Sequence, residues 1–475
     1  MFFFSIEFGI VFFVFFVLYW LLRTHLTIQN LLLLVFNYAI LCYFGSFYFA
    51  LVLAFYTLFI FAASYAIASS ESKAVFLASV AFVVCNLSFF KYYSSFKDGF
   101  ENLLRFFGLD FADIDVLLPL GLSFYSFASI TYLRAVYEAK HTPSDYVLLA
   151  NPKLESLPNL AAYLSFFPTI IAGPIMRSDF FFEQFKSLRF WSAKNAHPII
   201  VLLLFGIVKK VLIATYIQEY TQPILTNPLN YNILELIIGI CGYSVQIYCD
   251  FSGYVNLVCA FALMLGFVLP PNFNMPYMAR NLKDFWSRWH ISLSTFIRDF
   301  IYIPLGGSRK GFVLTQIFVL IAFGLSGIWH GNTINFMIWG LLHGIGLVVL
   351  NIMRVLSLSF GANYLGRYLA SLVTFCFVTF AWIFFYYKDL DDSMLFLSAF
   401  STNFSKPIEL SQIGIVLFLL TLFSLYPLCA NLERWCVFYL YKIPSLLKPL
   451  ILGLILLVVF CFMPDGIPNF IYAGF

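Results

Sequence analysis

Apolar runs of about twenty residues alternate with short polar segments along almost the whole chain. A helix needs about 20 mostly apolar residues to cross the hydrocarbon core of a bilayer, and the sequence holds about ten to twelve such runs. The first run, residues 6–22, contains Glu7 and has no basic residue ahead of it, unlike a cleavable signal peptide. We interpret it as a retained span. The pattern predicts an all-α polytopic integral membrane protein.

Several segments interrupt this regular pattern. Residues 91–118 mix basic and acidic residues with aromatics, which predicts an amphipathic interfacial helix or loop rather than a span. Residues 138–160 and 174–197 are mixed connectors. Between them, SFFPTIIAGPIMR is apolar but short and proline-containing, which favours a re-entrant or broken helix. Irregular backbone at membrane depth is tolerated only where it is buried in protein or lines a cavity. A central chamber is therefore expected.

Composition excludes a soluble globular domain. Hydrophobic residues make up 62% of the chain and charged residues 11%, and the mean hydropathy is +0.91. The nine cysteines lie mostly in apolar runs without a C-x-x-C pair, so they are expected to be small buried hydrophobes. We expect no metal site, no tightly bound cofactor and no nucleic-acid partner.

Basic residues in short loops predict the topology. No charged residue lies between Arg23 and Glu71, which fits two spans between cytoplasmic loops. Residues 280–310 carry six basic residues against two aspartates, so this segment is also expected to be cytoplasmic. Both termini then lie on the outer side.

One histidine stands out because it lies in an otherwise uncharged apolar run. His330 belongs to GLSGIWHG, and a continuous helix from Lys310 would carry it about 30 Å from the basic segment. Ionisable residues in membrane segments usually mark function, and a neutral imidazole suits a general base. His343 is a possible neighbour but more often a packing residue. Asp250, the intramembrane acid that stands out, is expected to pair with a base or orient a polar network.

The order of several motifs resembles the membrane-bound O-acyltransferase family, in particular its bacterial branch that exports acetyl groups to polysaccharides. The matching segments are LPLGLSFYSF (118–127), FFPTIIAGPIMR (166–177), QIYCDFSGY (246–254), WSRWHISLSTFIRDFIYIPLGGSRKG (286–311), GLSGIWHG (324–331), WGLLHG (339–344) and NFIYAGF (469–475). The resemblance implies one transmembrane domain over residues 1–475, with a core at about 118–345 and a tail at 469–475. It also implies a helical ring around a funnel. The chain departs from the branch at Ala135, Val255, Asn256 and Tyr386, so no role is carried over to these positions.

The resemblance also implies roles for particular residues. His330 takes the position of the family's catalytic histidine and His290 that of its second histidine, although His290 could equally line a donor channel or pack structurally. Tyr472 lies in an F-x-Y-x-x-F ending like that of related export systems, where the tyrosine is thought to receive the acyl group. The alternative role for Tyr472 is that of an aromatic anchor at the membrane interface. A phenol has a pKa of about 10, so it needs a base within reach.

Basic residues of the predicted cytoplasmic segment are candidates for binding the phosphates of coenzyme A. They are Lys283, Arg288, Arg298, Arg309 and Lys310. The alternative for each is that it only sets topology against anionic lipid.

Taken together, the residues and the resemblance predict an O-acetyltransferase of the bacterial inner membrane with both termini periplasmic. Acetyl-CoA is the expected donor, and a soluble periplasmic O-acetyltransferase of SGNH type is the expected partner. Peptidoglycan is favoured as the final acceptor, with alginate or another exopolysaccharide as the alternative. Two further alternatives are a polytopic transporter with His330 as a proton relay and a lipid-modifying or protein-acylating member of the same family.

Overall fold

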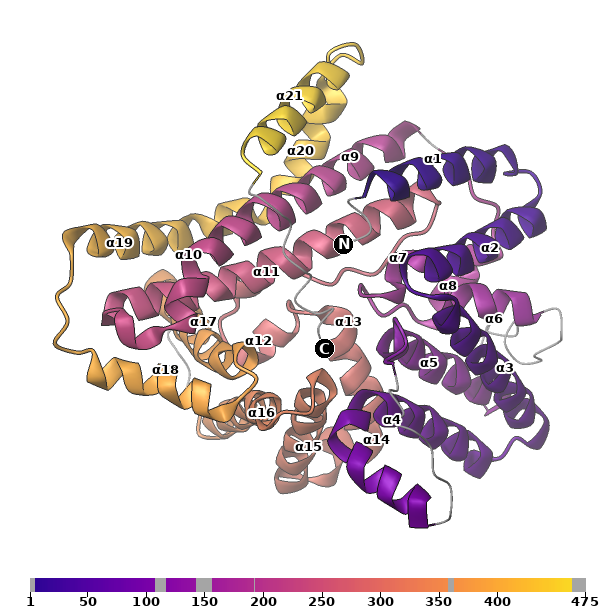
Figure 1. Ribbon diagram of the computed structural model, residues 1–475, viewed down its shortest axis with the longest axis horizontal. Coiled ribbons are helices and arrows are strands. Elements are labelled where there is room, and N and C mark those ends of the chain that lie inside the picture. The colour runs from indigo at the N-terminus through magenta and orange to yellow at the C-terminus, as the bar shows by residue number, and fades with distance from the viewer. Residues whose placement is uncertain (1–4, 107–116, 142–155, 192, 358–362, 464–475) are drawn as a thin grey trace. The chain divides into compact units, whose positions relative to one another are not determined.

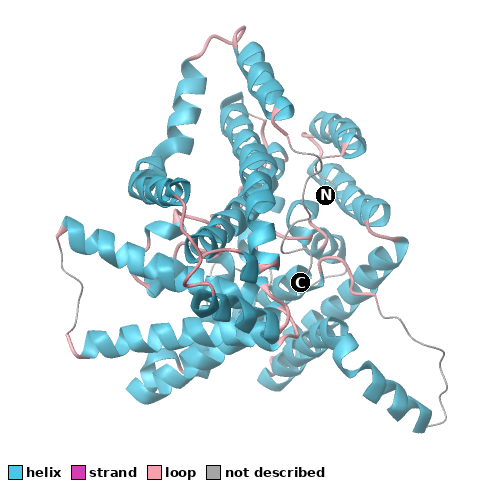
Figure 2. Cartoon of the chain, turned by 60° about the vertical axis from the view of Figure 1, so that its left-hand side comes forward, coloured by secondary structure: helices cyan, strands magenta, loops and turns pink. Residues whose placement is uncertain are grey.

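The computed structural model describes residues 5–106, 117–141, 156–191, 193–357 and 363–463. Within these ranges the regular structure is entirely helical, as Figure 2 shows. The helices group into two compact units. The first unit is Met1–Asn195 with Phe261–Pro270, and the second is Ala196–Ala260 with Pro271–Phe475. The expected single domain over residues 1–475 stays a prediction.

The first unit begins with long apolar helices and continues with short ones (Figure 1). Its helices are α1 (Ile6–Leu21), α2 (Leu26–Phe44), α3 (Phe47–Ser70), α4 (Lys73–Phe106), α5 (Leu122–His141), α6 (Leu157–Leu164), α7 (Phe167–Ile170) and α8 (Ser178–Phe185). Side-chain caps set some of the starts: Ser5 and Ser46 accept hydrogen bonds from backbone N–H groups in the first turns of α1 and α3. The two predicted spans between Arg23 and Glu71 are confirmed as α2 and α3.

The broken backbone predicted around Pro168 is confirmed, because α6, α7 and α8 are each eight residues long or shorter. Buried polar side chains hold these pieces in place. The Asn37 amide donates to the Ala162 carbonyl at 3.3 Å, and its oxygen accepts from the Phe167 N–H at 3.2 Å. Arg189 is buried and donates to Gln29 at 2.9 Å and to Asn30. The two bonds of Asn37 satisfy backbone groups that the short helices leave open.

Residues 91–106, expected to form an amphipathic interfacial helix or loop, are helical and continue α4 without a break. At 1.5 Å per residue, the 34 residues of α4 extend about 51 Å, more than the hydrocarbon thickness of about 30 Å. Its second half therefore carries Lys91, Lys97 and Arg105 on a helix that began as a span. The ion pair between Lys97 and Glu101 at 3.9 Å lies in this half.

The second unit contains the longest buried helix and the helical hairpin that carries His330. It holds most of α9 (Ala193–Ile207) and of α11 (Ile233–Met264), whose residues 193–195 and 261–264 belong to the first unit. Its other helices are α10 (Ala214–Thr226), α12 (Leu282–Trp286), α13 (Ile291–Ile297), α14 (Ile303–Leu305), α15 (Phe312–His330), α16 (Ile334–Val355), α17 (Tyr364–Tyr386), α18 (Leu390–Thr402), α19 (Leu410–Leu425), α20 (Leu432–Lys442) and α21 (Lys448–Cys461). A π-helical segment, Val208–Ile213, joins α9 to α10, and a second one, Arg298–Tyr302, follows α13. Such segments are frequent at functional sites.

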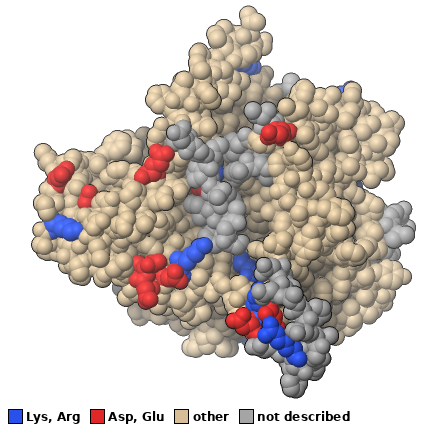
Figure 3. Space-filling model, viewed as in Figure 1, with Lys and Arg blue, Asp and Glu red and all other residues tan. Residues whose placement is uncertain are grey.

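In the described part of the chain, nine helical segments are long and apolar enough to cross a membrane. Two shorter apolar helices, Glu7–Leu21 and Lys448–Cys461, accompany them. Figure 3 shows that acidic and basic residues are sparse on the visible face, and large apolar side chains are exposed along most of the long helices. A helix that is apolar on its outer side is stable there only against lipid. The protein is therefore a multi-pass membrane protein.

Candidate active site

His330 is the last residue of α15, and Gly331 follows it as the cap. The histidine side chain is only 2% exposed. Its ring lies 4.7 Å from that of Trp329, 5.0 Å from that of Trp339 and 5.1 Å from that of Phe385, centroid to centroid. One continuous helix connects the basic segment to His330, and its 19 residues extend about 28 Å. The catalytic role of His330 stays a prediction.

Glycine contacts bring α15 and α16 together as a tight hairpin (Figure 1). A Cβ atom on Gly327 would lie 2.3 Å from the Phe336 carbonyl oxygen, and one on Gly340 would lie 2.3 Å from the Phe323 oxygen. The two backbones can approach this closely only because neither residue has a side chain. Since Gly327 lies one turn before His330, this contact determines where the imidazole sits against α16.

The surroundings of His330 suit proton transfer in a dry site. Aromatic rings exclude water, and hydrogen bonds and charges are stronger where water is excluded. A neutral imidazole can accept the proton of an attacking hydroxyl group. The partial negative charge at the C-terminal end of a helix interacts favourably with the imidazolium that results. The geometry therefore fits a general base.

Sequence reasoning missed a set of tryptophans that line this region. The rings of Trp339 and Trp382 are stacked, with centroids 5.7 Å apart, and Trp382 lies 5.2 Å from Trp289. The indole N–H groups of Trp339 and Trp382 are buried, and in the described part of the chain neither has a hydrogen-bond acceptor. A buried indole N–H group can donate a hydrogen bond to a further group, such as a substrate oxygen. The unusual density of tryptophan around both histidine motifs is the signal that could have indicated this lining.

His290 lies in a different setting, at the start of α13. Its backbone adopts φ 42°, a left-handed conformation that is unfavourable for residues other than glycine. The ring is 1% exposed, and its Nδ1 lies 3.3 Å from Asn272 Oδ1. The same oxygen accepts from the Ser292 N–H at 3.1 Å and from its hydroxyl at 2.8 Å. With Oδ1 as the acceptor, Nδ1 carries the proton and Nε2 is the basic nitrogen.

Burial lowers the pKa of His290 to about 3, because desolvation disfavours the imidazolium ion. The ring is therefore neutral near pH 7. Its Phe251 neighbour lies edge-on at 4.8 Å. These contacts fit either alternative raised for this residue, a channel wall or a packing role.

His343 lies one helical turn beyond Trp339 on α16 and is fully buried. Its ring packs against Trp339 at 5.1 Å and Trp286 at 5.0 Å, so Trp339 lies between His343 and His330. Among the described residues, neither of its ring nitrogens has a hydrogen-bond partner. The expected packing role fits these aromatic contacts.

The five predicted phosphate-binding cations fall into different settings. Arg288 forms an ion pair with Asp284 at 2.6 Å, and Arg298 forms one with Asp299 at 2.7 Å. Arg309 and Lys310 are exposed just before α15, and no salt bridge of either is found within the described ranges. Lys283 is exposed and lines a cavity between α12, α16 and α17. The donor-binding role of these residues stays a prediction.

Asp250 pairs with a base, as expected, and the base is Lys210. Lys210 is fully buried and Asp250 is 2% exposed. Lys210 lies in the π-helical segment Val208–Ile213, next to Lys209, whose ammonium donates to Asn256 Oδ1 at 2.9 Å. The position 256, where the chain departs from the branch, thus holds a partner of a lysine. Tyr472 and the tail at 469–475 lie outside the described residues.

Residues 106–390 match the membrane-bound O-acyltransferase (MBOAT) family, so the chain belongs to this family. It is 33% identical over 324 residues to a peptidoglycan O-acetyltransferase from Helicobacter pylori, covering 65% of this chain and 61% of that protein. It is 34% identical over 313 residues to a probable alginate O-acetylase, AlgI, from Pseudomonas aeruginosa, covering 65% of this chain and 56% of AlgI. A more distant relative is a teichoic acid D-alanyltransferase from Bacillus subtilis, 29% identical over 247 residues, with 49% of this chain and 62% of that protein covered.

The matched regions thus span less than two thirds of the length of each of these relatives. Two of these relatives are named for O-acetylation, of peptidoglycan and of alginate, and the third for D-alanyl transfer to teichoic acid. Membership of the family argues against the alternative of a polytopic transporter.

Proposed function

We propose that this protein is an O-acetyltransferase that moves acetyl groups across the bacterial inner membrane for the O-acetylation of cell-wall polysaccharide. The observation that carries the proposal is the position of His330, buried among aromatic rings at one end of α15, while Arg309 and Lys310 lie at the other end. One end of the hairpin thus offers exposed positive charge and the other a dry, basic imidazole. Family membership supports the acyl-transfer chemistry.

Acetyl-CoA is the proposed donor. Exposed cations attract phosphates, and Arg309, Lys310 and Lys283 are the predicted cations that form no salt bridge among the described residues. Arg288 and Arg298 already neutralise aspartates and are weaker candidates. Reaction at His330 requires the thioester to reach the aromatic end of the hairpin.

The proposed reaction follows from the groups around His330. Its imidazole takes the proton of an acceptor hydroxyl as the oxygen forms a bond to the thioester carbonyl carbon. The carbonyl oxygen becomes negatively charged, and the indole N–H of Trp339 is the candidate donor that stabilises it. The carbon–sulfur bond then breaks, and the imidazolium returns the proton to the coenzyme A thiolate.

Tyr472 is the proposed acceptor hydroxyl. Its phenol is a weak nucleophile near neutral pH and depends on a base such as His330. A soluble periplasmic transferase of SGNH type would then take the acetyl group from Tyr472 and place it on the glycan. This order requires the C-terminal end to be periplasmic, and the distribution of basic residues predicts this for both termini.

Peptidoglycan is the proposed final acceptor, supported by the Helicobacter pylori relative. The similar identity to AlgI favours alginate as the second candidate. Gene deletion followed by analysis of wall sugars separates the two. Loss of O-acetyl groups from muramic acid supports the first, whereas unchanged wall sugars contradict it.

Labelled acetyl-CoA tests the proposed chemistry on the purified full chain. Wild type is expected to release coenzyme A and to carry label on the protein, and both His330→Ala and Tyr472→Phe are expected to abolish the label. Two matched controls, His25→Ala and Tyr439→Phe, change exposed side chains of the same types and should behave as wild type. If the wild type does not consume acetyl-CoA, the proposed donor is wrong. If it turns over without labelling, Tyr472 is not the carrier.

A further inference from the structure

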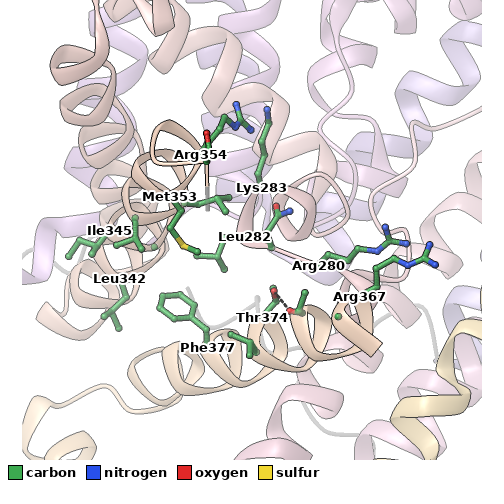
Figure 4. A pocket seen from close by; sticks show the side chains of 18 residues that line it. Arg280, Leu282, Lys283, Leu342, Ile345, Met353, Arg354, Arg367, Thr374 and Phe377 are labelled. Carbon is green, nitrogen blue, oxygen red and sulfur yellow. Dashed lines mark hydrogen bonds between the residues drawn. The ribbon is translucent and has the colours of Figure 1, made fainter. Parts of the chain in front are cut away.

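A cavity of about 810 Å³ lies between α12, α16 and α17 (Figure 4). Its wall is aliphatic and aromatic, with Ile345 and Val349 from α16 and Val373 and Phe377 from α17. Ile345, Val349 and Val373 are about half exposed, so the cavity opens sideways along the helices. In a multi-pass protein such an opening meets lipid acyl chains. The hydroxyl of Thr374, one of the few polar groups of the wall, already donates to the Ala370 carbonyl at 2.8 Å.

The rim of this cavity is basic. Arg280 and Lys283 come from the start of α12, Arg354 from the end of α16 and Arg367 from the start of α17. All four are exposed, and within the described ranges none of them forms a salt bridge. Figure 4 shows the four side chains extending away from the apolar wall, toward its edge. Asp284, next to Lys283 in the chain, is already paired with Arg288.

A second, smaller cavity of about 220 Å³ shares Arg280 and Arg367 with the first. Tyrosines supply much of its lining: Tyr277, Tyr364, Tyr368 and Tyr426. The Tyr368 hydroxyl lies 3.1 Å from the Ser424 hydroxyl. The two guanidinium groups therefore have an apolar space on one side and a more polar space on the other.

We propose that these cavities bind an anionic phospholipid. The phosphate lies against Arg280 and Arg367, the polar headgroup enters the tyrosine-lined cavity, and an acyl chain lies along the wall of α16 and α17. Guanidinium groups bind phosphate through paired hydrogen bonds, and an aliphatic wall matches an alkyl chain. Acetyl-CoA matches this space poorly, because its acetyl group has only two carbon atoms and the rest of the molecule is polar. Lys283 therefore belongs with the lipid rather than with the donor.

The test uses the full chain in detergent and measures the affinity for phosphatidylglycerol by native mass spectrometry, with phosphatidylcholine of the same acyl chains as the reference lipid. Phosphatidylglycerol should bind in preference. The double variant Arg280→Gln/Arg367→Gln should weaken it about thirtyfold, because each basic residue contributes about 1 kcal/mol and 1.4 kcal/mol is tenfold. The matched control Lys388→Gln/Arg434→Gln removes two exposed cations outside the cavities and should leave the affinity unchanged.

A second pair of variants tests the acyl-chain part of the site. Val349→Trp fills the cavity from a half-exposed position and should weaken phosphatidylglycerol at least tenfold, whereas Leu325→Trp, at a similarly exposed position on α15, should not. Equal affinity for the two lipids would overturn the proposal. So would equal losses in the variants and their controls. Displacement of the lipid by acetyl-CoA would also overturn it and would assign the cavity to the donor instead.

Discussion

Lys210 and Asp250 form an ion pair inside the second unit, and removing one member should destabilise the protein far more than removing both. Lys210 is fully buried and Asp250 is 2% exposed, so water cannot solvate a charge that loses its partner. We consider two single variants that keep the shape of the side chain, Asp250→Asn and Lys210→Met. The third variant, Lys210→Met/Asp250→Leu, replaces the pair by apolar side chains.

The burial of both groups sets the expected magnitude. Breaking a buried pair by removing one partner costs about 3–5 kcal/mol, because an uncompensated charge stays in a medium of low dielectric. Replacing both members by apolar residues of similar volume is often neutral or stabilising. Each single variant should therefore lose about 3–5 kcal/mol of unfolding free energy, and the double variant should lose much less than the sum of the two.

Equilibrium unfolding in mixed micelles, followed by circular dichroism during an SDS titration, measures these free energies. Lys209→Met is the matched control, because Lys209 is the neighbouring lysine of the same π-helical segment but is only half-buried and bonds to the neutral Asn256. It should cost less than Lys210→Met. A loss below about 1 kcal/mol for Asp250→Asn, or a double variant equal to the sum of the single ones, would refute the coupling.

Three further predictions concern the site itself. Trp339→Phe should lower the rate of acetyl transfer by a factor of about 10²–10³, as expected for the loss of one oxyanion donor. Trp382→Phe removes the other indole of the same stack and should lower the rate much less, which the kinetics of label transfer can measure. Gly340→Ala should lower the unfolding free energy by about 1–3 kcal/mol and reduce activity, because its Cβ would lie 2.3 Å from the Phe323 carbonyl oxygen. Gly324→Ala is the control: its Cβ would have an ordinary contact at 3.6 Å, so the same SDS titration should show no loss of unfolding free energy. His290 has a pKa of about 3 in the folded protein and 6.5 in the unfolded chain, so the unfolded state binds more protons as the pH falls. Between pH 7 and pH 5 the wild type should therefore lose about 2 kcal/mol of unfolding free energy through this group, and His290→Asn should not show this loss. Equal losses in the two proteins would contradict the burial of a neutral ring.

Local patterns predicted the elements that depend on local properties. Continuous apolar runs indicated the spans, the prolines around Pro168 indicated the broken helices, and the lone Asp250 indicated a basic partner. The charges of residues 91–106 interrupt the apolar pattern, but nothing in that segment ends a helix, so the pattern did not indicate that the helix runs on from Lys73 without a break. A helix already formed from Lys73 can continue past the hydrocarbon at little cost.

Features that depend on distant parts of the chain were not predictable in the same way. Arg189 bonds to Gln29 and Asn30, which precede it by about 160 residues. Arg280, Arg354 and Arg367 meet at the rim of the large cavity, although their spacing in the sequence follows no helical repeat that would predict this. The indole N–H of Trp339, which has no acceptor among the described residues, likewise depends on what packs around it rather than on its neighbours in sequence. Single-sequence reasoning supplied the chemical groups, but packing decides which of them meet.

The hairpin of α15 and α16 has one more consequence, for changes of chain length. Each residue of an α-helix turns the chain by about 100°. One residue inserted between Phe312 and Gly327 would therefore turn His330 about 100° away from the aromatic rings, unless the glycine contact with Phe336 were given up instead. The same insertion before Phe312 leaves the helix in register. Insertions and deletions are thus tolerable around α15 but not within it, and the spacing between the basic segment and the histidine is a fixed length of this protein.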